Sequence, residues 1–330
     1  MITLIKDISR NRLSIPVAIL LSLVLSGLTF WFVSHLLPSA QPDNSVWIPI
    51  ESLKENLHRG VIVNFLVAIA GSWGIFKLNE AFSLSHYRTY LPFLFYLLLQ
   101  VTNPSLQFIS EGTFTMLLGI PALAVLFTSY QRETASGEGF RVGILLGILS
   151  IFWSKGLLYA PLFLIGFWLM RSWNLKIFTG ALLGVIAPFW IQFSWMFFKG
   201  DSPLFFSQFE ELSGYAITAI TAIGLPMKIN LGLTFLLATI TGSYLLVTNF
   251  REKVRTQAYY NFLILLSIYS AALCIVDSKN ITGHLTWLYI SEAFLISNIF
   301  IKVQTKLTTF LFLLIIGAYL TAYVFNLWIN

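Results

Sequence analysis

The stretch that decides the fold runs from Phe140 to Met170 and reads FRVGILLGILSIFWSKGLLYAPLFLIGFWLM, with one charge near its middle, Lys155. Its 31 residues are too many for one comfortable membrane crossing, because about 20 apolar residues span the hydrocarbon core. We therefore predict two short helices, 140–153 and 157–170, that meet at a break around Lys155. An ionisable residue at such a depth predicts a functional site near one membrane face.

The composition places most of the chain in lipid. Of its 330 residues, 57% are hydrophobic and 10% are charged, whereas soluble globular chains carry roughly 25% charged residues. The single cysteine, Cys274, excludes an internal disulfide and a thiolate metal cluster. The first apolar run, 14–37, has 24 residues. A signal-peptide core has only about 7–15, so we predict a retained first helix.

The predicted fold class is all-α: a polytopic transmembrane bundle of about eleven spans in a single integral-membrane domain, 1–330. The expected helices are 14–37, 60–78, 88–101, 113–130, 140–153, 157–170, 177–198, 229–249, 258–276, 284–301 and 307–328. With a cytoplasmic N-terminus, the inner segments hold 14 basic residues and the outer segments hold 6, as the positive-inside rule requires. If 140–170 were a single span, the inner segments would hold 10 basic residues and the outer segments 9. The bias in basic residues would then disappear, so it also favours two helices joined as a hairpin.

Two further patterns concern packing. Phe205, Phe209 and Leu212 follow one another at i, i+4 and i+7 in the long outer segment after the seventh helix. This spacing predicts a helix with one apolar stripe that rests on the membrane surface. The segments 143–147 and 180–184 are GxxxG patterns in apolar helices. Packing within the chain is the default interpretation of such patterns, and dimerisation is the alternative.

The sequence contains no nucleotide, zinc-protease or serine-hydrolase motif, and its four histidines are scattered, so we predict no metal and no cofactor. The predicted outer face instead carries acids and bases: Asp43, Glu51, Glu55, Arg59, Glu111, Lys155, Asp277 and His284. A cation there could hold the phosphate of a lipid substrate while a carboxylate takes a proton from an acceptor hydroxyl. We expect Lys155, Glu111 and a carboxylate of the first outer loop to line one open hollow. The competing interpretation is that the acids are solvated and that Lys155 only reaches toward the headgroups.

Glu292 is expected in the middle of the tenth helix, within Tyr-Ile-Ser-Glu-Ala-Phe. A carboxyl group cannot face lipid cheaply, so we expect it to pair inside the bundle. We favour a structural role for this residue, and a role in transport is the alternative.

The order of short motifs in the first half of the chain resembles that of GT-C-type glycosyltransferases, membrane enzymes that use polyprenyl-phosphate sugars. The motifs are Tyr87-Arg-Thr-Tyr-Leu-Pro92, Asn103-Pro-Ser105, Glu111, Gly147-Ile-Leu-Ser-Ile-Phe-Trp-Ser-Lys155 and Pro161. The resemblance implies a GT-C-like core over about 14–200, with short third, fifth and sixth helices, followed by C-terminal helices over about 229–328. It also implies site roles. The phosphate-binding residues would be Lys155, Arg59 and His284, and the catalytic acids would come from Asp43, Glu51, Glu55 and Glu111.

The whole chain is also similar to an uncharacterised family of multi-span inner-membrane proteins from Bacteroides-type bacteria. This second resemblance implies a multi-pass protein of the bacterial inner membrane. The predicted function is transfer of a sugar from a polyprenyl-phosphate donor on the periplasmic face. The alternatives are a non-catalytic subunit of an inner-membrane complex, with a protein partner, and a transporter. Nucleic acid is not an expected partner, because the formal charge of +6 follows from membrane orientation.

Overall fold

The computed structural model describes residues 8–9, 11–32, 57–132, 136–214 and 223–329. The described residues form helices and turns and contain no strand, which confirms the all-α prediction. The α-helices are α2 (Ser14–Trp31), α4 (Leu57–Ala81), α5 (Leu91–Val101), α6 (Glu111–Thr128), α7 (Ser136–Phe152), α8 (Tyr159–Leu169), α9 (Leu175–Lys199), α10 (Ser202–Ser213), α12 (Leu225–Thr248), α13 (Val254–Val276), α14 (Ile281–Lys302) and α15 (Lys306–Ile329). Short 3-10 turns connect several of them: η1 (Pro104–Leu106), η2 (Ser154–Leu158), η3 (Asn249–Arg251) and η4 (Ser278–Asn280).

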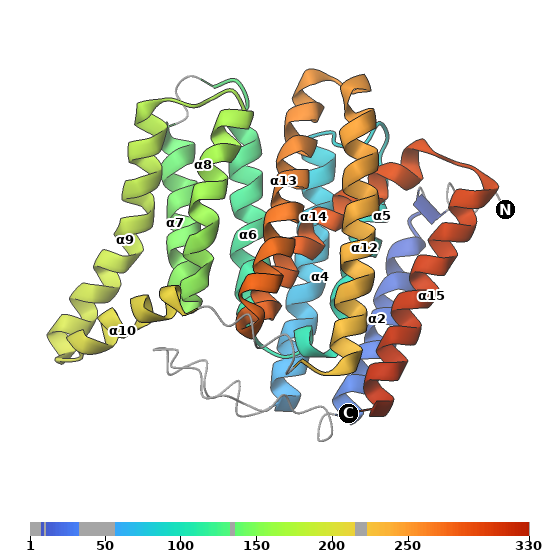
Figure 1. The fold of residues 1–330 in the computed structure, drawn as a ribbon, viewed down its shortest axis with the longest axis horizontal. Helices are drawn as coiled ribbons and strands as arrows, with labels where there is room; N and C mark the ends of the chain where they lie inside the picture. Colours follow the sequence, from blue (N-terminus) through green and yellow to red (C-terminus); the bar gives the residue numbers. More distant parts are fainter. Residues whose placement is uncertain (1–7, 10, 33–56, 133–135, 215–222, 330) are drawn as a thin grey trace.

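Each of the eleven predicted helices has a counterpart in the structure. The boundaries agree within four residues, except that α2 ends at Trp31 where the prediction continued to residue 37. Residues 33–37 lie outside the described part of the chain. The predicted surface helix also has a counterpart, α10, which lies across one end of the bundle (Figure 1).

In the part of the chain that the structure describes, eight helices are long and apolar enough to cross a membrane, which is the pattern of a polytopic membrane protein. They are α2, α4, α6, α9, α12, α13, α14 and α15. The other three predicted spans are shorter: α5 has 11 residues, α7 has 17 and α8 has 11. These are the third, fifth and sixth helices, for which the sequence predicts reduced length.

The long apolar stretch breaks where the sequence predicts a break. Trp153 has extended backbone angles, φ −150° and ψ 100°, which end α7 and start the η2 turn. Lys155 and Gly156 lie within η2, and α8 follows from Tyr159. The two short helices therefore form a hairpin with Lys155 at its tip.

Glycines allow α7 and α9 to pack backbone against backbone. A Cβ atom on Gly143 would lie 2.3 Å from the carbonyl oxygen of Ala181, and one on Gly184 would lie 2.3 Å from the carbonyl oxygen of Phe140. Real Cβ contacts are never so short, so the close approach depends on glycine at both positions. Both GxxxG patterns are thus used within the chain, as the default interpretation predicts.

Helix α14 forms the centre of the bundle. Nineteen of its residues are buried, and it contacts α5, α6, α12 and α13. In Figure 1 it crosses obliquely behind α12 and α13. Because α14 is enclosed, an ionisable side chain at its centre is stabilised only if it has a partner inside the protein.

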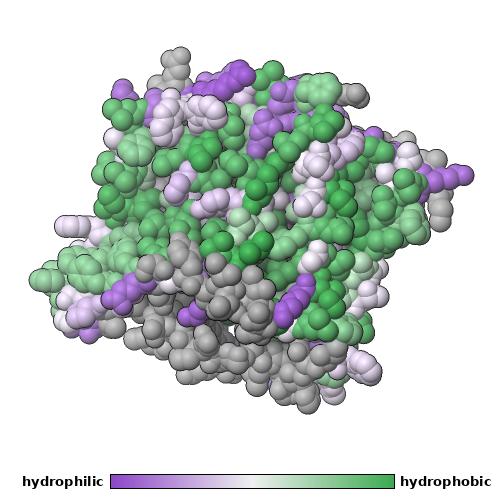
Figure 2. Space-filling view, in the orientation of Figure 1, coloured by the Kyte–Doolittle hydropathy of each residue, from purple (hydrophilic) through white to green (hydrophobic). Residues whose placement is uncertain are grey.

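The two ends of the bundle differ in charge. One end, which we call the basic end, is where α2, α5 and α15 begin (Figure 1). The basic residues described on the helix ends and connections there include Arg12, Lys77, Arg88, Arg132, Arg141, Arg171, Lys176, Lys253, Arg255, Lys302 and Lys306. The opposite end, which we call the site end, has fewer: Arg59, Lys155, Lys199, Lys228 and Lys279. Figure 2 shows a broad apolar surface between hydrophilic residues toward its upper and lower margins.

Candidate functional site

The tip of the α7–α8 hairpin holds Lys155 inside the protein. Only 1% of Lys155 is exposed. Its Nζ atom donates to the carbonyl oxygen of Gly214 at 2.8 Å and lies 3.5 Å from that of Leu212. It also lies 3.7 Å from Oδ2 of Asp277. A buried ammonium group requires an opposite charge and acceptor oxygens, and these three groups supply them.

Asp277 is the centre of the cluster. It is fully buried between α13 and α14. Nε2 of His284 lies 3.2 Å from its Oδ2, and Nδ2 of Asn280 donates to both carboxylate oxygens at 3.2 and 3.0 Å. Burial raises the pKa of Asp277, but the hydrogen bonds from His284 and Asn280 and the charge of Lys155 outweigh it, so the pKa lies below its usual value. Asp277 is therefore an ionised counterion.

His284 connects this carboxylate to the interior. Its Nδ1 atom lies 3.0 Å from the hydroxyl oxygen of Tyr159, which in turn lies 3.5 Å from Oγ of Ser270. The ring of Trp153 packs edge-on against His284, with 4.9 Å between ring centroids. Both ring nitrogens of His284 are thus occupied, so its geometry suits the positioning of Asp277. The predicted phosphate-binding role of His284 stays a prediction.

Glu111 reaches the same segment from another side. It is the first residue of α6, and its Oε2 accepts a short hydrogen bond from Oγ1 of Thr282. The helices meet closely because Gly112 follows: a Cβ there would lie 2.6 Å from Oγ1 of Thr286. Glu111 is half-buried, unlike Asp277. Three predicted site residues from distant parts of the sequence, Glu111, Lys155 and His284, therefore converge on the first turns of α14.

Helix α10 covers the cluster. Phe205 and Phe209 of the predicted apolar stripe pack against α9: the ring centroid of Phe205 lies 5.1 Å from that of Phe193, and that of Phe209 lies 5.4 Å from that of Phe189. These two residues face the protein, which corrects the prediction that the stripe rests on the membrane surface. This anchoring places the last carbonyl groups of α10 over Lys155. The site differs here from the predicted open hollow, because the helix end and the ring of Trp153 enclose the charged groups.

Of the remaining predicted site residues, the structure describes only Arg59. The acids of the first outer loop, Asp43, Glu51 and Glu55, fall outside the described residues. Arg59 is exposed in the first turn of α4, at the site end of the bundle. The predicted sharing of one site by a loop-one acid and Lys155 is thus not tested by the structure.

Sequence reasoning noted Asp277 only as an outer acid and missed its central place. A usable signal was present in the short segment between two apolar helices. Asp277, Asn280 and His284 are spaced at i, i+3 and i+7, so they share one face once the chain turns helical. Tyr159 and Ser270 carried no such signal, since both lie within apolar runs. Among the described residues, no three His, Cys, Asp or Glu side chains are grouped as a metal site would require.

Glu292 forms a second buried polar site, deeper along α14. Its Oε1 accepts a hydrogen bond from Oγ of Ser267 at 2.7 Å, and its Oε2 accepts one from Oγ1 of Thr241 at 2.8 Å. The residue is fully buried. It pairs inside the bundle with α12 and α13, as the sequence predicts.

A comparison of the sequence with protein-family models found no match, and a comparison with curated proteins found none either. The functional assignment therefore depends on the geometry of the two polar sites.

Proposed function

We propose that this chain is a GT-C-like membrane protein that binds a polyprenyl-phosphate-linked sugar at the site end of its bundle. The observation that carries the proposal is the convergence of Lys155, Asp277 and Glu111 on the start of α14. An ammonium group can bind a phosphate through charge-assisted hydrogen bonds. A half-buried carboxylate nearby can act as a general base.

The proposed reaction is transfer of the sugar to an acceptor hydroxyl. The bond between the anomeric carbon and the phosphate oxygen breaks, and a bond from the acceptor oxygen to the anomeric carbon forms. Lys155 stabilises the charge that develops on the phosphate. The acceptor proton passes to a carboxylate, for which Glu111 is the described candidate and Asp43, Glu51 and Glu55 are the predicted ones.

The closed arrangement determines how a substrate would enter. The shortest described contact of Lys155 is with the carbonyl oxygen of Gly214, at 2.8 Å, just beyond α10. A phosphate would replace this neutral acceptor with a charged one, while Asp277 keeps its hydrogen bonds from His284 and Asn280. The proposal therefore requires the end of α10 to move away from Lys155 when the lipid binds.

The proposed orientation follows from the charge difference between the ends. We infer that the basic end faces the cytoplasm and that all eleven predicted spans cross the bacterial inner membrane. Exposed aromatic residues support a membrane surface at the site end: Trp195 of α9 is 63% exposed and Phe198 is 87% exposed. Such side chains anchor helix ends in the headgroup layer.

The test is binding of undecaprenyl phosphate to the purified protein in lipid nanodiscs. We expect Lys155→Met to weaken binding at least tenfold and Lys155→Arg to retain most of it. Lys279→Met is the matched control, because Lys279 is exposed and lies two residues from Asp277. Equal binding by Lys155→Met and the wild type would refute the proposal, whatever their melting temperatures.

The second step separates catalysis from binding. Each of Asp43, Glu51, Glu55 and Glu111 is replaced singly by its amide, and glycan synthesis is measured in membranes. Loss of synthesis with retained lipid binding in one variant identifies the base. If all four variants keep full synthesis, the chain is not the transferase, and the alternative of a non-catalytic subunit takes its place.

A further inference from the structure

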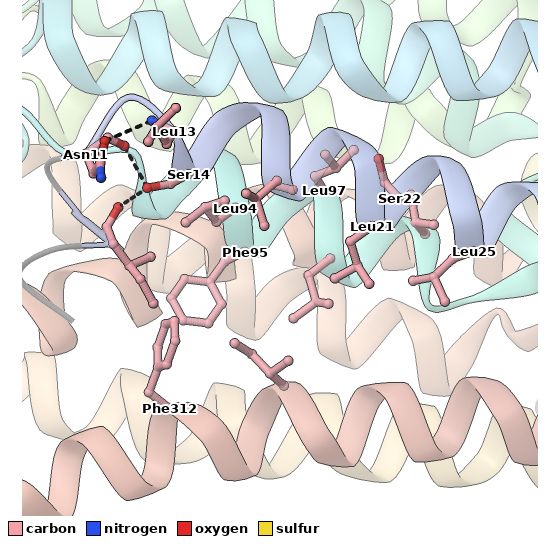
Figure 3. Close-up of a pocket in the computed structure, with 16 residues that line it drawn as sticks. Asn11, Leu13, Ser14, Leu21, Ser22, Leu25, Leu94, Phe95, Leu97 and Phe312 are labelled. Carbon is pink, nitrogen blue, oxygen red and sulfur yellow. Dashed lines mark hydrogen bonds between the residues drawn. The ribbon is translucent and has the colours of Figure 1, made fainter. Parts of the chain in front are cut away.

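An apolar groove opens between α2, α5 and α15, in the basic half of the bundle (Figure 3). Its volume is about 350 Å³. Leucine, valine, isoleucine and phenylalanine side chains form most of its walls, and Asn11 and Ser14 provide polar groups at one end. The groove lies far from the Lys155 cluster, which is at the opposite end of the bundle (Figure 1).

The groove is closed toward the site end. There α2 and α15 are joined, because Tyr323 donates to the carbonyl oxygen of Leu25 at 2.5 Å and lies 2.8 Å from Oγ1 of Thr29. Toward the basic end the two helices part, and Phe312 and Ile316 of α15 line the opposite wall. As far as the described residues show, the groove is therefore closed at Leu25 and open where α2 begins.

The depth of the groove matches one leaflet of a bilayer. The lining residues along α2 run from its N-cap, Leu13, to Leu25, a helical rise of about 18 Å. Half of the hydrocarbon core is about 15 Å thick. Leu13 and Val17 line the groove and are 66% and 67% exposed, so it also opens sideways toward lipid.

The open end of the groove is positively charged. Arg12 directly precedes Leu13, and Lys306 begins α15 six residues before Phe312. Both basic side chains are exposed. Lysine and arginine side chains near a membrane surface attract anionic lipid. The groove thus combines an apolar slot of leaflet depth with two cations at its mouth.

We propose that this groove binds one anionic phospholipid, with an acyl chain along α2 and the headgroup phosphate between Arg12 and Lys306. The inference does not depend on the proposed sugar transfer, because it concerns the opposite end of the molecule. The acyl chain of the bound lipid fills the space between α2 and α15. It would hold the two helices together toward the basic end, where the structure describes no hydrogen bond between them.

Filling the groove tests the acyl-chain site. Val17 and Leu20 lie on the same helix and are 67% and 66% exposed, but only Val17 lines the groove. The protein is delipidated, incubated with dioleoylphosphatidylglycerol, and examined by native mass spectrometry. We expect Val17→Trp to reduce the bound lipid at least fivefold and Leu20→Trp to leave it unchanged. Equal effects of the two substitutions would overturn the proposal, since the lipid would then be an unspecific annular one.

The headgroup requirement is tested by charge removal. The double variant Arg12→Gln/Lys306→Gln should lose the preference for dioleoylphosphatidylglycerol over dioleoylphosphatidylcholine. Lys176→Gln, an exposed lysine at the same end on α9, should keep it. If the wild type binds neither lipid after delipidation and its melting temperature is unaffected, part of the chain itself fills the groove and the proposal is wrong.

Discussion

Two buried carboxyl groups on or beside α14 have opposite surroundings. Asp277, at the end of the bundle, faces the ammonium group of Lys155 and hydrogen bonds from His284 and Asn280. Glu292, deep in the bundle, accepts hydrogen bonds from the hydroxyl groups of Ser267 and Thr241. The first site is built for a charge, and the second can hold a neutral acid. The difference predicts that removing the charge lowers the free energy of unfolding strongly at Asp277 and only slightly at Glu292.

The largest expected effect is that of Asp277→Ala. The substitution leaves Lys155 buried without its counterion and removes the acceptor for His284 and Asn280. Loss of one partner of a buried ion pair costs about 3–5 kcal/mol. We expect the free energy of unfolding in mixed micelles to fall by this amount. The control is Asp201→Ala, which removes an exposed acid at the same end of the bundle. If both variants lose the same free energy of unfolding, the buried ion pair of Asp277 contributes no special stability.

Removing the cation should have a smaller effect than removing the anion. In Lys155→Met, Asp277 keeps the hydrogen bonds from His284 and Asn280, and these still stabilise its negative charge. We expect a loss of about 1–3 kcal/mol. The double variant Lys155→Met/Asp277→Asn should lose less than the two single variants together, with a coupling of about 0.5–3 kcal/mol. If the losses of the two single variants simply add in the double variant, the ion pair between Lys155 and Asp277, at 3.7 Å, contributes nothing to stability.

Acid should weaken the Asp277 site. The pKa of Asp277 is lowered in the folded protein, so its ionised form stabilises the fold above the unfolded value of about 3.9. This stability is lost as the pH falls through the lowered folded-state pKa, at no more than about 1.4 kcal/mol per pH unit. The measurement is the melting temperature of the wild type and Asp277→Asn between about pH 2 and pH 6. The difference in melting temperature between the wild type and Asp277→Asn should become smaller as the pH falls. A difference that stays constant would contradict an ionised Asp277.

The comparison also explains what the sequence could predict. Helix positions follow from apolar runs and from the distribution of basic residues, both of which are local signals. The break at Lys155 and the packing of both GxxxG patterns within the chain were therefore predicted correctly, but that these two patterns pack on each other was not predicted. The pairing of Glu292 was predicted because an intramembrane acid must have a partner. Its actual partners, Ser267 and Thr241, depend on how α12 and α13 rotate against α14.

The candidate site was predicted only in part, for a tertiary reason. Lys155 was found because its charge interrupts an apolar run. Asp277 was not selected, since an acid between two helices is common and its importance comes from the hairpin tip that packs on it. The enclosure of Lys155 depends on the carbonyl group of Gly214, and backbone carbonyls carry no sequence signal.

The smallest expected effect is that of Glu292→Gln. The amide keeps one acceptor oxygen for Ser267, and its NH2 group can donate to Oγ1 of Thr241. Thr241 can accept, because its single hydroxyl proton can then be donated to the carbonyl oxygen of Leu237, 2.9 Å away. We therefore expect the free energy of unfolding to change by less than about 1 kcal/mol. Glu292→Leu is the matched variant, and it should lose about 1–3 kcal/mol because the buried hydroxyl of Ser267 loses its acceptor. If Glu292→Gln lowers the free energy of unfolding as much as Glu292→Leu does, the negative charge of Glu292 is needed in the folded protein. That result would support the alternative role of this residue in transport.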